Sequence, residues 1–140
     1  MLIAAVSFQP AARRRVLLVE DHEDTRAMYA EFLESTFDVD TAADAAAALR
    51  QARQARPDVI VTDQSLPGMD GFEMVAALRA DPSLADIPVV CLSGFGGSAH
   101  EARARAAGCD RILQKPCMPD ALAAVVLEVL DEPQSRRKDS

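Results

Sequence analysis

Four short apolar runs in this chain each lead into a residue that can bind a metal ion or a phosphate group. The first leads into Glu20 and Asp21, the second into Asp63, the third into Ser93 and the fourth into Lys115. The runs have the length and Val/Ile/Leu content of buried strands, and the stretches between them are long enough for helices. This alternation predicts an α/β protein of the (βα)5 type, in which helices cover a mostly parallel sheet.

The same reading predicts five strands and five helices. Asp44 can cap the second helix, Gly108 suits a left-handed end of the fourth, and Pro119 suits the first turn of the fifth. Helical periodicity predicts that Met28 and Phe32 of the first helix face the sheet. Strands are expected at 16–19, 39–41, 59–61, 89–92 and 111–113, and helices at 25–34, 44–55, 72–80, 99–107 and 119–130.

The polar residues at the strand ends should lie close together, because the carboxyl ends of parallel strands meet at one edge of the sheet, where ligands bind. Glu20, Asp21 and Asp63 would repel one another there and would resist ionising unless a cation joined them. Magnesium prefers oxygen ligands and often bridges carboxylates to phosphate oxygens. The three carboxylates therefore predict an Mg²⁺ site, with Ser93 and Lys115 beside it.

Each of these residues is much less informative when it is considered alone. Asp63 alone is more typical of a strand-end or turn cap than of a site residue, and Glu20 with Asp21 is equally typical of the acidic start of a helix. A single lysine such as Lys115 is usually only solvated, and the glycines after Ser93 are also typical of a plain turn. The interpretation as a site depends on the combination of all of them.

Length, charge and cysteine content limit the classes of protein. The chain has 140 residues, of which 49% are hydrophobic, and this fits one globular domain at 15–131 between a flexible extension at 1–14 and a disordered tail at 132–140. Residues 16–131 carry 9 basic against 20 acidic side chains, which argues against nucleic acid or anionic membrane as partners. Three irregularly spaced cysteines without a secretory leader predict a cytoplasmic protein with reduced thiols.

Five motifs occur in an order that resembles the receiver domain of two-component response regulators over about residues 15–131. This resemblance implies a flavodoxin-like, doubly wound sheet with strand order 2-1-3-4-5. The reaction it implies is transfer of a phosphoryl group from a phosphohistidine, followed by slow self-catalysed hydrolysis, which makes the protein a signalling domain rather than an enzyme. The motifs are VLLVED at 16–21, PDVIVTD at 57–63, LPGMDG at 66–71, LS at 92–93 and KP at 115–116.

The resemblance also implies roles for individual residues and for partners. The partners would be a sensor histidine kinase or a histidine phosphotransfer protein, and a downstream protein target that contacts the fourth helix, fifth strand and fifth helix. The implied roles are Asp63 as phosphoacceptor, Glu20, Asp21, Asp63 and the backbone carbonyl of Ser65 as Mg²⁺ ligands, Ser93 as switch hydroxyl and Lys115 as phosphate contact.

Two departures from the family pattern keep other functions open. Ile112 stands where the family usually has an aromatic switch residue, and Gln64 belongs to a pair that is usually apolar. A stand-alone phosphoaccepting receiver is the first expectation, and a phosphorylation-independent interaction module is the alternative. A metal-dependent phosphohydrolase would usually have a second acid two residues after its nucleophile, where this chain has Ser65.

The last helix and the two histidines also bear on the surface of the protein. The fifth helix is apolar almost all round over residues 121–130, which is typical either of a homodimer or partner contact or of an alanine-lined exposed side. His22 and His100 each stand alone in a polar stretch and are interpreted as surface residues without a functional role.

Overall fold

The computed structural model describes residues 13–132. The expected N-terminal extension and C-terminal tail therefore lie almost wholly outside the described residues. The described strands are β1 (Arg15–Val19), β2 (Asp38–Ala42), β3 (Val59–Asp63), β4 (Val89–Ser93) and β5 (Arg111–Gln114). The described helices are α2 (Glu23–Leu33), α3 (Ala45–Gln54), α4 (Gly71–Ala80), α5 (Ser98–Ala107) and α6 (Pro119–Asp131).

The five strands form one parallel sheet in the order β2-β1-β3-β4-β5. This confirms the (βα)5 class and the flavodoxin-like order. Strand β3 is the middle strand and β4 lies next to it, and every residue of both is buried, as expected for a parallel sheet that is covered on both faces. The central strands therefore hold their last residues, Asp63 and Ser93, on a rigid support.

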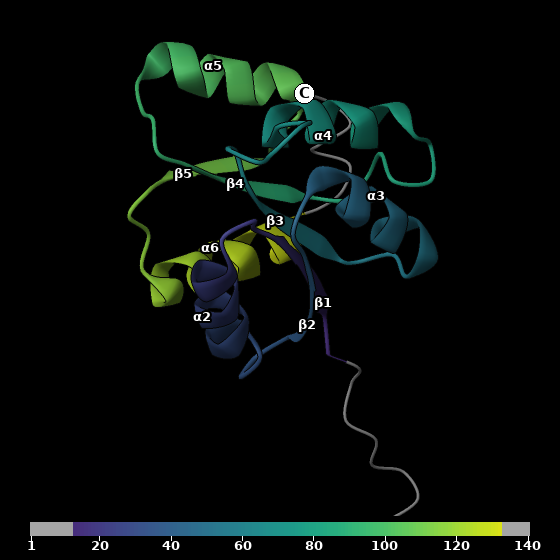
Figure 1. Cartoon of the computed structure of the whole chain (residues 1–140), viewed down its shortest axis with the longest axis vertical. Coiled ribbons are helices and arrows are strands. Elements are labelled where there is room, and N and C mark those ends of the chain that lie inside the picture. The colour runs from purple at the N-terminus through teal and green to yellow at the C-terminus, as the bar shows by residue number, and fades with distance from the viewer. Residues whose placement is uncertain (1–12, 133–140) are drawn as a thin grey trace, which may run out of the picture.

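Helices cover both faces of the sheet (Figure 1). On one face α3, α4 and α5 lie against the sheet, with a core that includes Leu17, Leu49 and Leu78. On the other face α2 and α6 lie side by side, with a core that includes Leu33 and Val126. The alternation of Val16, Leu17, Leu18 and Val19 between these two cores follows from the period of two residues in a strand.

The expected helix ends are confirmed by local hydrogen bonds and backbone angles. The Asp44 carboxylate accepts a hydrogen bond of 2.8 Å from the Ala47 N–H at the start of α3. Gly108 ends α5 with a φ of 108°, in the left-handed region that glycine adopts without steric cost. Pro119 occupies the first turn of α6. These signals were readable in the sequence because each depends only on near neighbours along the chain.

The expected inward face of the first helix is wrong. Met28 and Phe32 are 44% and 43% exposed, whereas Tyr29, Ala30 and Leu33 are buried. The helix carries apolar residues along both neighbouring stripes, so periodicity alone does not determine which stripe faces the sheet. Packing against α6 determines it, because the buried stripe shares one core with residues of that helix.

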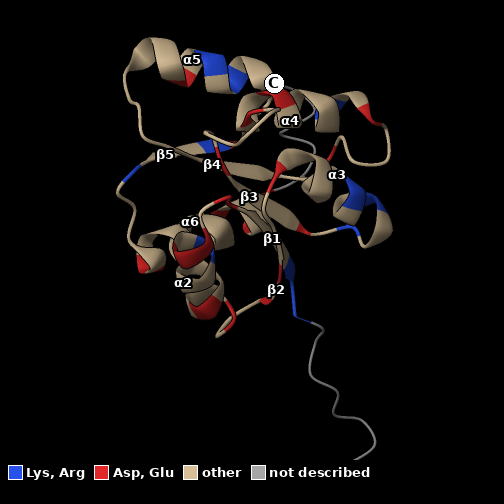
Figure 2. Ribbon diagram, in the orientation of Figure 1, with Lys and Arg blue, Asp and Glu red and all other residues tan. Residues whose placement is uncertain are grey.

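Charge is distributed unevenly between the two faces of the molecule (Figure 2). Helix α6 contains three acidic residues and no basic one, and α2 contains three acidic residues and one arginine. Helix α3 contains two arginines and no acid.

Among residues 13–132, no helix has both the length and the apolar content needed to cross a membrane.

Candidate metal centre at the carboxyl edge of the sheet

The structure brings the residues at the strand ends together at one edge. Asp63 and Ser93 are the last residues of β3 and β4, Glu20 directly follows β1, and Lys115 directly follows β5. The backbone beyond the strands continues the ladder, with the Lys115 N–H donating to the Ser93 carbonyl at 2.7 Å. The Lys115–Pro116 peptide bond that follows is cis. The site residues are therefore positioned by the sheet.

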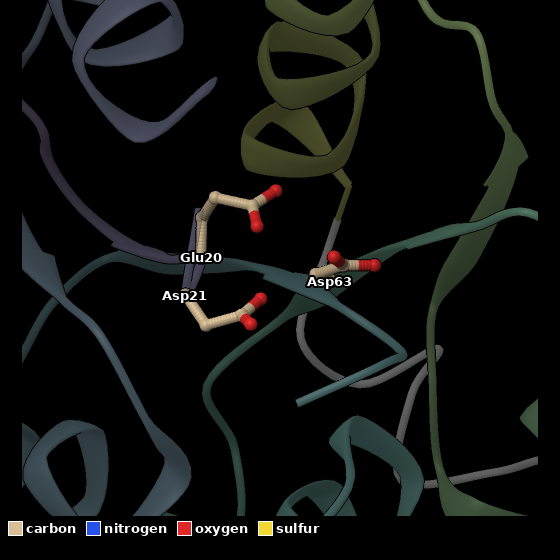
Figure 3. Close-up of side chains that lie close together, drawn as sticks. All are labelled: Glu20, Asp21 and Asp63. Atoms are coloured by element: carbon tan, nitrogen blue, oxygen red, sulfur yellow. The ribbon is translucent and has the colours of Figure 1, made fainter. Parts of the chain in front are cut away.

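Three carboxylates form a cluster at this edge. Figure 3 shows Glu20, Asp21 and Asp63 close together, and each offers an oxygen that lies within 4.8 Å of the others. Glu20 and Asp63 are only 2% and 6% exposed, whereas Asp21 is exposed. The cluster therefore has two buried carboxylates and one that faces solvent, an arrangement that a partly hydrated divalent cation can occupy.

Lys115 offsets part of the negative charge of this cluster. Its Nζ lies 2.9 Å from Asp63 Oδ2 and 3.7 Å from Glu20 Oε1. Burial by itself lowers the pKa of Lys115, but the hydrogen bond to Asp63 and the charges of Asp63 and Glu20 outweigh it, so the pKa lies above its ordinary value. The lysine therefore carries its charge while it contacts the carboxylate of Asp63.

Glu20 remains incompletely satisfied in spite of this neighbour. Burial, together with the negative charge of Asp63, raises the pKa of Glu20 above its ordinary value of 4.5, although the His22 backbone N–H acts in the opposite direction. Within the described residues, Glu20 Oε1 is buried and has no hydrogen-bond partner. A buried carboxylate oxygen without a donor is what a cation ligand requires, so these residues fit Mg²⁺.

Magnesium affinity should weaken as pH falls, because protons compete with the metal for Glu20. Because the pKa of Glu20 is raised, this competition begins at a higher pH than for an ordinary glutamate, so we expect the dissociation constant for Mg²⁺ to rise progressively as pH falls from about 7 to about 5. Titration calorimetry at a series of pH values would measure it. Glu31→Gln, a change at an exposed glutamate of α2, should keep the same pH dependence. An affinity that stays constant over this range would contradict the expectation.

The loop after β3 is fixed close to Asp63. The Ser65 N–H donates to Asp63 Oδ1 at 3.3 Å, and the Gly71 N–H donates to the Gln64 carbonyl at 2.8 Å. A Cβ at position 71 would lie 2.4 Å from the Asp63 carbonyl oxygen, so only glycine fits there. The exposed Ser65 is thus held next to the carboxylate cluster, where its backbone carbonyl stays the predicted metal ligand.

Ser93 has a neighbour that the sequence interpretation missed. His100, the third residue of α5, is half-buried and places Nε2 at 2.7 Å from Ser93 Oγ, so the expectation that it stands alone is wrong. The glycine-rich turn at 94–97 reverses the chain and brings the first turn of α5 over the end of β4. No sequence motif indicates this contact, because the two side chains belong to different elements that are joined by the irregular residues 94–97. Ile112 is partly buried against a small apolar cluster of Phe72, Cys91 and Ala104.

The fold and this edge cluster define a doubly wound α/β protein with a carboxylate–lysine site of the kind that handles phosphate with a divalent metal. The family model for the response regulator receiver domain matches residues 16–127. The chain therefore belongs to the response regulator receiver domains, and this confirms the resemblance seen in the motifs.

Curated relatives agree with this family. The response regulator Rre1 of Synechocystis is 34% identical over 122 residues, which cover 86% of this chain and 53% of that protein. The transcriptional regulatory protein PrrA of Mycobacterium tuberculosis is 41% identical over 117 residues, which cover 83% of this chain and 49% of that protein. This chain thus spans about half the length of these relatives. It matches 85% of the polar-differentiation response regulator DivK of Brucella anthropi at 32% identity over 104 residues, or 74% of this chain.

Solved structures show the same fold. The chemotaxis protein CheY4 of Vibrio cholerae superposes with a TM-score of 0.80 at 34% identity, covering 84% of this chain and 99% of that one. The receiver domain of a Pseudomonas aeruginosa sensor histidine kinase superposes with a TM-score of 0.79 at 26% identity, covering 86% of this chain and 100% of that one. That structure has a magnesium ion coordinated in its active-site cleft.

Proposed function

We propose that this protein is a phosphorylation-controlled signalling domain that accepts a phosphoryl group on Asp63 from a histidine kinase or a histidine phosphotransfer protein. The observation that carries this proposal is the placement of the Lys115 ammonium 2.9 Å from Asp63 Oδ2, at the edge of the three-carboxylate cluster. One carboxylate then acts as acceptor while a neighbouring cation offsets the charge of the incoming group.

The chemistry follows from the positions of these groups. An oxygen of Asp63 attacks the phosphorus of the donor, the N–P bond to the donor histidine breaks, and the new acyl phosphate stays in the site. Glu20, Asp21, Asp63 and the Ser65 carbonyl would hold Mg²⁺, which supplies charge stabilisation to the transferred group when it is bound. The Lys115 ammonium contacts a phosphoryl oxygen, and water later hydrolyses the acyl phosphate.

The surface that we propose for signalling is formed by α5, β5 and α6. Three large apolar side chains on or next to these elements are exposed: Phe95 at 65%, Met118 at 68% and Leu127 at 47%. Phosphorylation adds about two negative charges and strong hydrogen-bond acceptors next to the end of β4, so it can draw the β4–α5 loop inward. A change there would alter a surface suited to binding a protein target or a second copy through α6.

We further propose that the domain acts as a stand-alone receiver in the cytoplasm. The match to most of the length of DivK, a response regulator, supports this organisation. The alternative, a phosphorylation-independent interaction module, would leave the carboxylate cluster without a use. The proposed function accounts for the cluster and for its lysine together.

The test is labelling of the wild-type protein with acetyl phosphate, with and without Mg²⁺, measured by intact mass spectrometry. We expect a gain of one phosphoryl group that requires Mg²⁺ and is lost rapidly in base, because acyl phosphates are cleaved by hydroxide and hydroxylamine. Absence of any modification at saturating donor and metal would overturn the proposed function and would favour the phosphorylation-independent module.

A further inference from the structure

We propose that His100 is a positioning residue that holds the Ser93 hydroxyl in the unphosphorylated protein and releases it when Asp63 is phosphorylated. This inference rests on the proposed function and on the role of switch hydroxyl that the family resemblance implies for Ser93, in which its hydroxyl binds a phosphoryl oxygen on Asp63. His100 would thereby control the Ser93 hydroxyl, a role that the family resemblance implies for an aromatic residue at the position of Ile112 in β5. His100 contacts Ser93 from the first turn of α5.

The hydrogen bonds of Ser93 leave little freedom for its hydroxyl. Ser93 is fully buried, and its Oγ lies 2.7 Å from His100 Nε2. The same Oγ accepts a hydrogen bond of 3.1 Å from the Phe95 backbone N–H. A serine hydroxyl has one proton to donate. The Phe95 N–H occupies one of the two acceptor positions of the hydroxyl. We infer that the Ser93 proton is directed to Nε2, in the imidazole tautomer that carries its proton on Nδ1 and leaves Nε2 as the acceptor.

A phosphoryl group on Asp63 would compete with His100 for this proton. Phosphoryl oxygens accept hydrogen bonds and do not donate them, so Ser93 can bind one only by redirecting its single proton. The bond to Nε2 is then lost. Formation of the phosphoryl contact and breakage of the Ser93–His100 contact are therefore one event, and the affinity for a phosphoryl group is lowered by the strength of the bond that breaks.

The imidazole ring of His100 lies between a buried and an exposed aromatic side chain, so breakage of the Ser93–His100 contact can affect the surface. Its centroid lies 5.3 Å from that of Phe72, which is 4% exposed, and 5.9 Å from that of Phe95, which is 65% exposed. The Arg103 guanidinium of α5 lies over the Phe72 ring, 5.1 Å from its centroid. The ring therefore connects a buried side chain of α4 to an exposed one of the β4–α5 loop. Release of His100 would change the surface at Phe95.

Ile112 cannot perform this function. Its side chain is partly buried against Phe72, Cys91 and Ala104, and it has no polar atom that could bind a hydroxyl. Among the residues that the structure describes, the side chain that forms a hydrogen bond with Ser93 is that of His100. The control of the hydroxyl therefore comes from the first turn of α5 and not from β5.

The experiment measures binding of beryllofluoride, a stable analogue of the acyl phosphate, in saturating Mg²⁺. We compare the wild-type protein with His100→Phe, which keeps a ring between Phe72 and Phe95 but lacks the acceptor, and with His100→Gln, which restores an acceptor. Loss of one neutral hydrogen bond should tighten binding in His100→Phe by about two- to tenfold. His100→Gln should bind nearly as the wild type does. In a Ser93→Ala background His100→Phe should have no effect, which makes a double-mutant cycle.

A second readout requires no substitution. The ¹⁵N resonance of His100 Nε2 should move when Mg²⁺ and beryllofluoride are added together and should stay in place with Mg²⁺ alone, because only the analogue takes the hydroxyl. Equal or weaker binding by folded His100→Phe, or an imidazole resonance that does not move, would overturn the proposal about His100 while the proposed function stands. Failure of the wild-type protein to bind the analogue at all would overturn both.

Discussion

Replacing Asp63 with Asn is expected to abolish the gain of phosphoryl mass from acetyl phosphate. The substitution exchanges a carboxylate oxygen for an amide nitrogen, and an amide is too weak a nucleophile to form a stable phosphoryl linkage. It also removes one of the three carboxylates that lie within 4.8 Å of one another. Intact mass spectrometry under conditions that label the wild-type protein would measure the result.

The matched control for this change is Asp120→Asn. Asp120 is an exposed aspartate in the first turn of α6, where its carboxylate accepts a hydrogen bond from the Ala121 N–H. Loss of its charge should cost about 0.3–1 kcal/mol of stability and should leave labelling at the wild-type level. A phosphoryl group that Asp63→Asn gains at the wild-type rate would place the acceptor elsewhere in the chain.

Lys115→Met should slow phosphorylation of Asp63 by about a hundred- to a thousandfold. The ammonium lies 2.9 Å from Asp63 Oδ2, and removal of one positioned donor from a charged transition state costs about this much in rate. Methionine keeps most of the length and apolar volume of the lysine stem, so the packing around residue 115 should change little. Rates of labelling by acetyl phosphate in Mg²⁺ would give the ratio directly.

Magnesium binding separates this effect from misfolding. Lys115 repels a cation at the carboxylate cluster, so its removal should tighten Mg²⁺ binding while it slows phosphorylation. Thermal unfolding with and without Mg²⁺ would measure the affinity, because a ligand that binds only the folded protein raises its stability. A variant that loses Mg²⁺ binding as well as phosphorylation would contradict the assigned function of Lys115.

Much of the fold was predictable from short-range signals. Apolar runs such as Val59–Thr62 form buried strands because their side chains leave no polar face. Strands are present at all five expected places, although β2 and β5 at the two edges of the sheet are mostly exposed or half-buried. The Asp44 cap and the left-handed Gly108 also follow from residues within one turn of the chain. The first helix shows the limit of such signals, because Met28 and Phe32 form an apolar stripe that only contact with α6 could distinguish from the buried one.

Some features of the candidate site were also predictable from the sequence, and others depend on tertiary packing. The sequence by itself determined that Glu20, Asp21, Asp63, Ser93 and Lys115 would meet, because parallel strands must place their carboxyl ends at one edge, while the roles of these residues stay predictions. Only the tertiary structure decided the burial of Glu20 and the contact between His100 and Ser93. Both depend on how helices and loops pack over the sheet edge, and packing is a property of residues that are distant along the chain.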